Sequence, residues 1–171
     1  ATRDYVLRVD RSAGGPVLNV FGGKITTYRR LAESALELVD AEFGRARAKW
    51  TAGVALPGGD FPVDGVAQLR RDLAEALPFL QASTIRRLIR QYGSEAQQIF
   101  AEADSAEALG NDFGSGIYQR ELDWAIGQEW VHEADDFLWR RSKLGLRVSA
   151  DQRQAIEGYI AAALSAKARV A

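Results

Sequence analysis

The spacing of apolar residues changes once along this chain, at Gly22-Gly23, and that change limits the folds the sequence can adopt. Before the two glycines, residues 16–21 form a short, β-rich run that predicts a buried strand. After them, apolar residues recur at helical spacing, which predicts a helix over about residues 26–43. Its apolar face comprises Tyr28, Leu31, Ala32, Ala35, Leu36 and Val39.

The segment before the glycines has the pattern of a β-hairpin. Residues 4–9 alternate imperfectly between polar and apolar side chains, and residues 11–15 have the composition of a turn. We therefore predict a hairpin over residues 2–21. A lone hairpin is marginally stable in water, so we expect it to lie against a sheet outside this chain. The absence of methionine, including at position 1, agrees with a piece cut from a longer protein.

Almost every periodic segment after Lys24 is helical, which predicts a mainly α fold with the hairpin at its N-terminus. We expect three parts: the hairpin at residues 1–22, a helix at 23–44 and a multi-helix C-terminal domain at 45–171. Ser149 and Gln152 form a capping-box sequence that predicts the start of the last helix. The helices of the C-terminal domain are expected at residues 66–75, 83–92, 95–103, 117–129, 134–144 and 149–168.

The junction between strand and helix carries groups that suit an anion or an electron-rich oxygen. Two glycines let the backbone approach a ligand without Cβ atoms in the way. The first N–H groups of the helix lack intrahelical partners and carry partial positive charge. The Lys24 ammonium and the hydroxyls of Thr26 and Thr27 add further donors. The alternative is an ordinary helix start with a capping threonine and a solvated lysine.

Composition excludes several kinds of site. The chain has 171 residues and a formal net charge of −1, which argues against a dedicated nucleic-acid binder. It has no cysteine, so no disulfide framework, zinc site or thiol nucleophile is expected, and its single histidine, His132, argues against a multi-histidine metal site and most histidine-based triads. No apolar stretch approaches the ~20 residues of a membrane span, so a cytosolic or peripherally attached protein is expected.

A second polar cluster lies near the end of the chain. Asp136 and Arg140 are four residues apart and are expected to pair on a helix. Arg140, Arg141 and Lys143 are candidates for binding phosphate or nucleic acid. The competing interpretation is an ion-pair cluster at a helix end, with Trp139 in the core.

Short motifs run in order through nearly the whole chain. They include Thr2-Arg3-Asp4-Tyr5, Val20-Phe21-Gly22-Gly23-Lys24-Ile25-Thr26-Thr27-Tyr28-Arg29, Trp50-Thr51, Leu56-Pro57-Gly58-Gly59, Tyr92-Gly93, Asp112-Phe113-Gly114, Glu129-Trp130-Val131 and Leu138-Trp139-Arg140-Arg141. In these motifs the sequence resembles the C-terminal part of bacterial FAD-dependent, respiratory glycerol-3-phosphate dehydrogenases. The resemblance implies that the hairpin belongs to an α/β FAD-binding body outside this chain.

The resemblance also implies a reaction and a set of contacts. The family oxidises sn-glycerol 3-phosphate to dihydroxyacetone phosphate on FAD and passes the electrons to membrane quinone. Lys24 would also reach the substrate, and Arg3 would lie near the substrate phosphate. The residues implied to lie at the flavin are Gly23, Lys24, Ile25, Thr26 and Thr27.

A physical argument agrees with that placement. Negative charge gathers near N1 and the C2 carbonyl of a flavin that receives hydride, and a helix N-terminus with a lysine opposes it. The resemblance places the catalytic histidine and the FAD fingerprint in the N-terminal FAD domain, which this chain lacks. We therefore expect no catalytic residue and no metal site here, and no retained FAD or turnover by the chain alone.

The resemblance implies further properties of the full-length protein. It would be cytoplasmic, peripheral at the inner membrane, able to form a homodimer, and without a nucleic-acid partner. Two other hypotheses remain open. One is a non-catalytic helical interaction module that binds an acidic protein partner through residues 139–143. The other is a phosphate- or nucleic-acid-binding domain built on the same residues.

Overall fold

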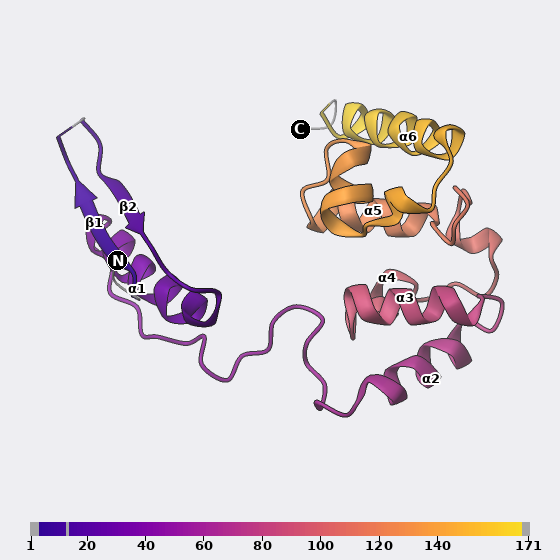
Figure 1. The fold of residues 1–171 in the computed structure, drawn as a ribbon, viewed down its shortest axis with the longest axis horizontal. Coiled ribbons are helices and arrows are strands. Elements are labelled where there is room, and N and C mark those ends of the chain that lie inside the picture. The colour runs from indigo at the N-terminus through magenta and orange to yellow at the C-terminus, as the bar shows by residue number, and fades with distance from the viewer. Residues whose placement is uncertain (1–3, 13, 169–171) are drawn as a thin grey trace. The chain divides into compact units, whose positions relative to one another are not determined.

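The structure is a computed structural model that describes residues 4–12 and 14–168. Its chain forms two compact units, Ala1–Val54 and Ala55–Ala171. The first holds the hairpin and one long helix, and the second holds the remaining helices (Figure 1). The expected fold class, mainly α with an N-terminal hairpin, is confirmed.

In the first unit, β1 (Val6–Asp10) and β2 (Val17–Phe21) pair antiparallel, with Val6 opposite Phe21 and Asp10 opposite Val17. A 3₁₀ turn, Ile25–Thr27, leads into α1 (Tyr28–Glu42), which lies against both strands (Figure 1). The Tyr5 and Ser34 hydroxyls lie 3.2 Å apart and join the chain before β1 to this helix.

The apolar face expected for α1 is not covered inside this unit. Tyr28, Leu36 and Val39 are exposed, and the side chains of α1 that are buried belong to Glu33 and Asp40. The strand expected to be buried, β2, is likewise largely open to solvent. The unit is too thin to cover its own apolar side chains, since two strands and one helix enclose little volume.

The second unit holds the helices from α2 to α6 (Figure 1). These helices pack around two apolar clusters. The first cluster is built on α2 (Val66–Ala76), α3 (Ala82–Tyr92) and α4 (Glu95–Ile99). The second is built on α5 (Gln119–Gln128), a π-helix at Asp136–Arg141 and α6 (Ala150–Ala168). Two further 3₁₀ turns lie at Glu107–Leu109 and Leu144–Leu146. No helix in the described ranges is long and apolar enough to cross a membrane.

A buried ion pair joins the two clusters. The Glu121 carboxylate, on α5, is 0% exposed and accepts bonds from both Arg87 terminal nitrogens, on α3, at 2.6 and 2.8 Å. The Tyr92 hydroxyl donates to the same carboxylate at 2.9 Å. Burial, with the charge of Glu121 beside it, holds the pKa of Tyr92 far above its usual value. The hydroxyl therefore stays a donor.

Two glycines anchor the start of the second unit to the end of α3. The Ser94 amide donates to the Gly58 carbonyl at 3.1 Å. Gly58 and Gly93 both have positive φ, +72° and +57°, and a Cβ on either would overlap the main chain of the other segment. Two of the sequence motifs, around Gly58 and Gly93, are thus one structural contact.

The structure corrects three helix predictions. α4 ends at Ile99 rather than residue 103, because Glu102 turns into the left-handed region at φ +64°, which a helix interior does not allow. The helix expected from residue 117 starts at Gln119. The helix expected over 134–144 contains the π-helix, in which the Ser142 amide bonds to the Phe137 carbonyl at 2.9 Å.

The π-helix also corrects the expectation for Trp139. The wider π turn shifts the phase of the side chains, so Phe137 and Leu138 are buried in succession while Trp139 is 38% exposed. The Trp139 ring lies against Gly145, where a Cβ would overlap it. Trp139 therefore packs on the turn that follows the π-helix and not in the core.

Candidate functional site

The glycine–lysine corner, residues 22–27, joins β2 to α1. Gly22 and Gly23 have φ of +75° and +109°, which side chains other than glycine rarely adopt. A Cβ on Gly22 would lie 3.1 Å from the Asp4 carbonyl oxygen, and one on Gly23 would lie 3.3 Å from the Leu31 side chain. The turn itself therefore requires both glycines, before any ligand is considered.

Thr27 forms the cap of this helix start. Its hydroxyl donates to the Lys24 carbonyl at 3.0 Å and accepts from the Lys24 amide at 3.3 Å. The Thr27 amide also bonds to the Lys24 carbonyl at 3.0 Å. A hydroxyl has one proton, so that of Thr27 is committed to the corner and is not available to a ligand. Capping, which the sequence left as an alternative for the threonines, holds for Thr27.

The rest of the corner presents its groups to solvent. Lys24, Ile25 and Thr26 are exposed, Ile25 by 86%. The Lys24 ammonium makes no hydrogen bond or ion pair within residues 4–12 and 14–168. The first turn of the 3₁₀ segment and that of α1 contain no acidic residue. The corner thus combines an uncompensated cation, the positive end of a helix and an exposed apolar side chain.

Two hydrogen-bonded clamps hold the chain after α1 against that helix. Glu33 accepts from the Thr51 hydroxyl at 2.5 Å and from Arg29 at 3.1 Å, and the Thr51 bond lowers the pKa of Glu33. Asp40 accepts both arms of Arg47, which lower its pKa. Residues 47–51 therefore run along α1 and brace the helix whose first turn forms the corner.

The remaining candidates of the sequence analysis fall elsewhere. Arg3 lies outside the described residues, so the structure does not bear on its position relative to Lys24. His132 is exposed, and its amide donates to Asp136 at 2.9 Å. No group of three or more His, Cys, Asp or Glu side chains in the described ranges is placed to hold a metal ion.

The basic residues Arg140, Arg141 and Lys143 lie in two different surroundings. Arg140 pairs with Asp136 at 2.5 Å and with Glu133 at 3.1 Å, which confirms the expected ion pair. The bond from the His132 amide, aided by Arg140, lowers the pKa of Asp136. Arg141 and Lys143 instead line a cleft together with arginines of α3. Sequence reasoning missed those arginines because they are some fifty residues away and have no motif of their own.

Comparison with known proteins agrees with the motifs. The sequence matches the family described as the C-terminal domain of alpha-glycerophosphate oxidase over residues 49–168. It is 41% identical over 163 residues to the aerobic glycerol-3-phosphate dehydrogenase of Escherichia coli K12, covering 93% of this chain and 32% of that protein. The glycerol-3-phosphate dehydrogenase of Pseudomonas aeruginosa PAO1 is 40% identical over 160 residues, covering 93% and 31%.

A relative with another substrate in its name is also similar. The D-erythritol 1-phosphate dehydrogenase of Brucella abortus 2308 is 34% identical over 154 residues, covering 90% of this chain and 31% of that protein. The chain spans about a third of the length of these relatives. The resemblance found in the motifs is confirmed at the level of the family.

Proposed function

Because this chain belongs to the family of the C-terminal domain of alpha-glycerophosphate oxidase, we propose that it is the C-terminal part of an FAD-dependent glycerol-3-phosphate dehydrogenase. The observation that carries the proposal is the 41% identity over 93% of the chain to a relative of that name. The relative named for D-erythritol 1-phosphate is 34% identical, so glycerol 3-phosphate is the better supported substrate. The full-length protein would oxidise sn-glycerol 3-phosphate to dihydroxyacetone phosphate.

The glycine–lysine corner is the part of this chain that we propose faces the flavin and the substrate. FAD, when bound, supplies the acceptor for the two electrons of the substrate. Three features of the corner fit an electron-rich ring: a lysine without a partner among the described residues, main-chain N–H groups of a first turn that contains no acidic residue, and the exposed Ile25. Gly23, Lys24, Ile25 and Thr26 would contact the cofactor, and Lys24 would also reach the substrate.

Thr27 has a different part in this proposal. Its hydroxyl closes the cap on Lys24, so it would hold the corner in shape and contact the flavin only through its other atoms. Arg3 would bind the substrate phosphate, as the resemblance implies. Thr27 and Arg3 can be separated by experiment, because loss of Arg3 would raise KM for the substrate while loss of the Thr27 cap would disturb cofactor binding.

The exposed apolar side chains of the first unit support the proposed domain organisation. Residues 1–22 would complete the FAD- and substrate-binding body, residues 23–44 would carry the flavin-facing helix, and 45–171 would form the helical domain. The side chains that such a body would cover include Val17, Val20, Phe21, Ile25, Tyr28, Leu36 and Val39. Full burial of Ile25, which is 86% exposed, would contribute about 1.5–3 kcal/mol, and the other side chains would each contribute less because they are already partly covered.

The same proposal includes the electron acceptor, the location and the oligomeric state of the full-length protein. It would pass electrons to quinone from the cytoplasmic side of the inner membrane, as a peripheral protein, and would form a homodimer. The 171-residue chain alone would retain no FAD and would not oxidise substrate. A yellow protein with stoichiometric FAD, purified from the 171-residue chain, would contradict this statement.

The role of Lys24 is tested by flavin reduction in the full-length protein. Lys24→Ala should slow the reduction of bound flavin by glycerol 3-phosphate about a hundredfold in single-turnover absorbance measurements, because a preorganised positive group is lost. Arg30→Ala is the matched control, since Arg30 is exposed on α1 and makes no bond or ion pair among the described residues. Equal rates for the two variants would refute the role of Lys24.

A further inference from the structure

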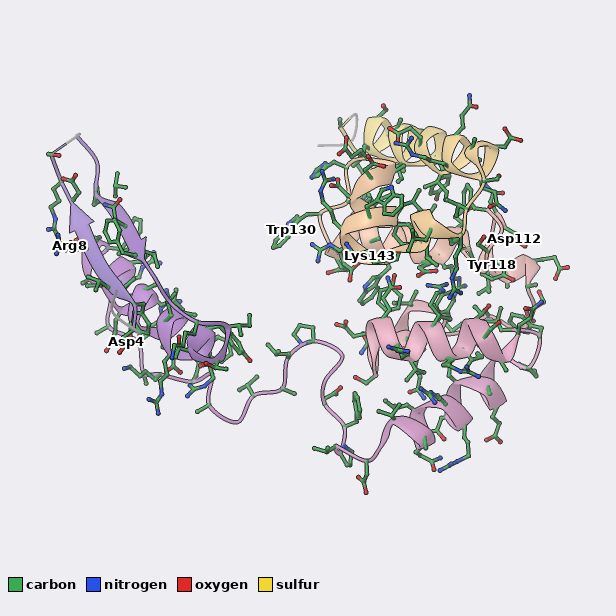
Figure 2. The ribbon with its side chains drawn as sticks, in the orientation of Figure 1. Asp4, Arg8, Asp112, Tyr118, Trp130 and Lys143 are labelled. Atoms are coloured by element: carbon green, nitrogen blue, oxygen red, sulfur yellow. The ribbon has the colours of Figure 1, made fainter. Side chains whose placement is uncertain are left out.

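A basic cleft of about 600 Å³ lies inside the second unit, between α3 and the turn that follows the π-helix. Figure 2 shows Lys143 on the side of the α5 and α6 helices that faces α3. None of the described residues that line the cleft is acidic. Six are basic: Arg86, Arg87, Arg90, Arg141, Lys143 and Arg147.

Three of these cations have no partner of their own. The side chains of Arg86, Arg90 and Arg147 are exposed, and their guanidinium groups make no hydrogen bond or ion pair in the part of the chain that the structure describes. Arginine on two sides of a hollow matches the oxygens of a phosphate group, because the guanidinium donates two parallel bonds. Like charges brought together repel, so an anion bound among them would relieve that repulsion.

The other three cations are held in place and frame the cleft. Arg87 is fixed by Glu121 at 2.6 and 2.8 Å, and Arg141 donates to the Glu129 carbonyl at 2.8 Å. The Lys143 ammonium donates to a main-chain carbonyl of the π-helix. A carbonyl partner leaves the positive charge of Lys143 uncompensated, whereas Arg141 also interacts with the Glu129 carboxylate and Arg87 with that of Glu121.

The turn that carries Lys143 and Arg147 is rigid and strained. Lys143 has φ +60°, a left-handed conformation that costs energy for a residue other than glycine. The turn is braced by the Trp139 ring against Gly145 and by the Ser115 hydroxyl, which donates to the Arg147 carbonyl at 3.2 Å. The fold thus maintains an unfavourable backbone that places two cations opposite α3.

We propose that this cleft binds a phosphate group, carried either by a small phosphate ester or by a phospholipid head group. Leu146 also lines the cleft and is 79% exposed. Its apolar side chain could contact the carbon chain of a phosphate ester or of a phospholipid. A hollow of this size suits a compact group better than a nucleic-acid strand, whose binding surface is an extended basic stripe. The inference is independent of the dehydrogenase proposal, since none of these residues lies in the glycine–lysine corner.

The test uses the 171-residue chain, with inorganic pyrophosphate and lipid vesicles as two separate probes. Calorimetric titration measures pyrophosphate binding, and co-sedimentation compares vesicles of phosphatidylglycerol with vesicles of phosphatidylcholine. The double variant Arg90→Gln/Arg147→Gln should weaken the observed binding by at least about tenfold, because charge-assisted bonds are lost. Neither side chain has a bond in the described structure, so the double variant should fold as the parent does by circular dichroism.

The double variant Arg30→Gln/Arg71→Gln is the matched control, because it removes the same two charges from exposed positions on α1 and α2, outside the cleft. Binding of pyrophosphate alone would identify a small phosphate ester as the source, and binding of phosphatidylglycerol vesicles alone would identify a head group. Competition between the two probes would show one phosphate site that serves both. Absence of binding to either probe, or an equal loss with Arg30→Gln/Arg71→Gln, would overturn the proposal.

Discussion

The buried pair of Arg87 and Glu121 offers a sharp test of what holds the second unit together. Glu121→Gln keeps the shape of the side chain but removes its charge, leaving the largely buried Arg87 without an ionic partner. Breaking a buried pair in this way costs about 3–5 kcal/mol. Arg87 retains its bond to the Gly116 carbonyl at 2.6 Å, so we expect the lower end, a loss of about 3 kcal/mol in unfolding free energy.

Urea denaturation followed by circular dichroism measures this loss, with Asp123→Asn as control. Asp123 lies on the same helix but is exposed, and it accepts a bond from the Tyr159 hydroxyl at 2.5 Å. Its change should cost less than about 1.5 kcal/mol.

A double-mutant cycle separates the energy of the Arg87–Glu121 ion pair from the other effects of changing the Glu121 side chain. In a background of Arg87→Met, the change Glu121→Gln should cost less than about 1 kcal/mol, because the cation that required the carboxylate is gone. If Glu121→Gln costs no more than Asp123→Asn, or costs the same in both backgrounds, the pair does not join the two clusters as argued.

Two further predictions concern the clamps on α1 and the glycines. Because their bonds lower the pKa values of Glu33 and Asp40, the clamps should stabilise the first unit fully above the ordinary carboxyl range and be lost as pH falls through the lowered pKa values. Hydrogen exchange of residues 47–51 against pH measures this, and protection that does not change with pH would contradict it. Gly93→Ala should destabilise by more than about 2 kcal/mol, because it adds a clash to an unsuitable φ. Gly158→Ala, in the open on α6, should instead stabilise by about 0.5–1 kcal/mol in the same urea series, and a loss there would refute the reasoning.

Features formed by residues that are close together in the sequence could be predicted from the sequence alone. The hairpin and α1 follow from a change in apolar spacing at the two glycines, since strand and helix differ in period. The capping box is confirmed, with the Ser149 amide 2.9 Å from the Gln152 side chain and the Gln152 amide 3.2 Å from the Ser149 hydroxyl. The Asp136–Arg140 pair is likewise confirmed, because both partners lie within one turn of the chain.

The candidate site was predictable in position but not in detail. The glycine–lysine corner was located from its motif, and the structure shows an exposed, unpaired Lys24 among the described residues. The motif alone did not show that Thr27 uses its proton on the Lys24 carbonyl, which depends on the exact turn of the first helical residues. The contacts of the corner with cofactor and substrate stay a prediction.

The amino-acid sequence by itself determined the family, the order of the elements and the place of the corner, because local spacing and short motifs encode all three. Tertiary structure decided which distant groups meet. It paired Arg87 with Glu121, turned Trp139 outward on the π-helix, and brought α3 arginines opposite Lys143 and Arg147. The reason is that packing chooses among many compatible faces of each helix, and no local pattern specifies that choice.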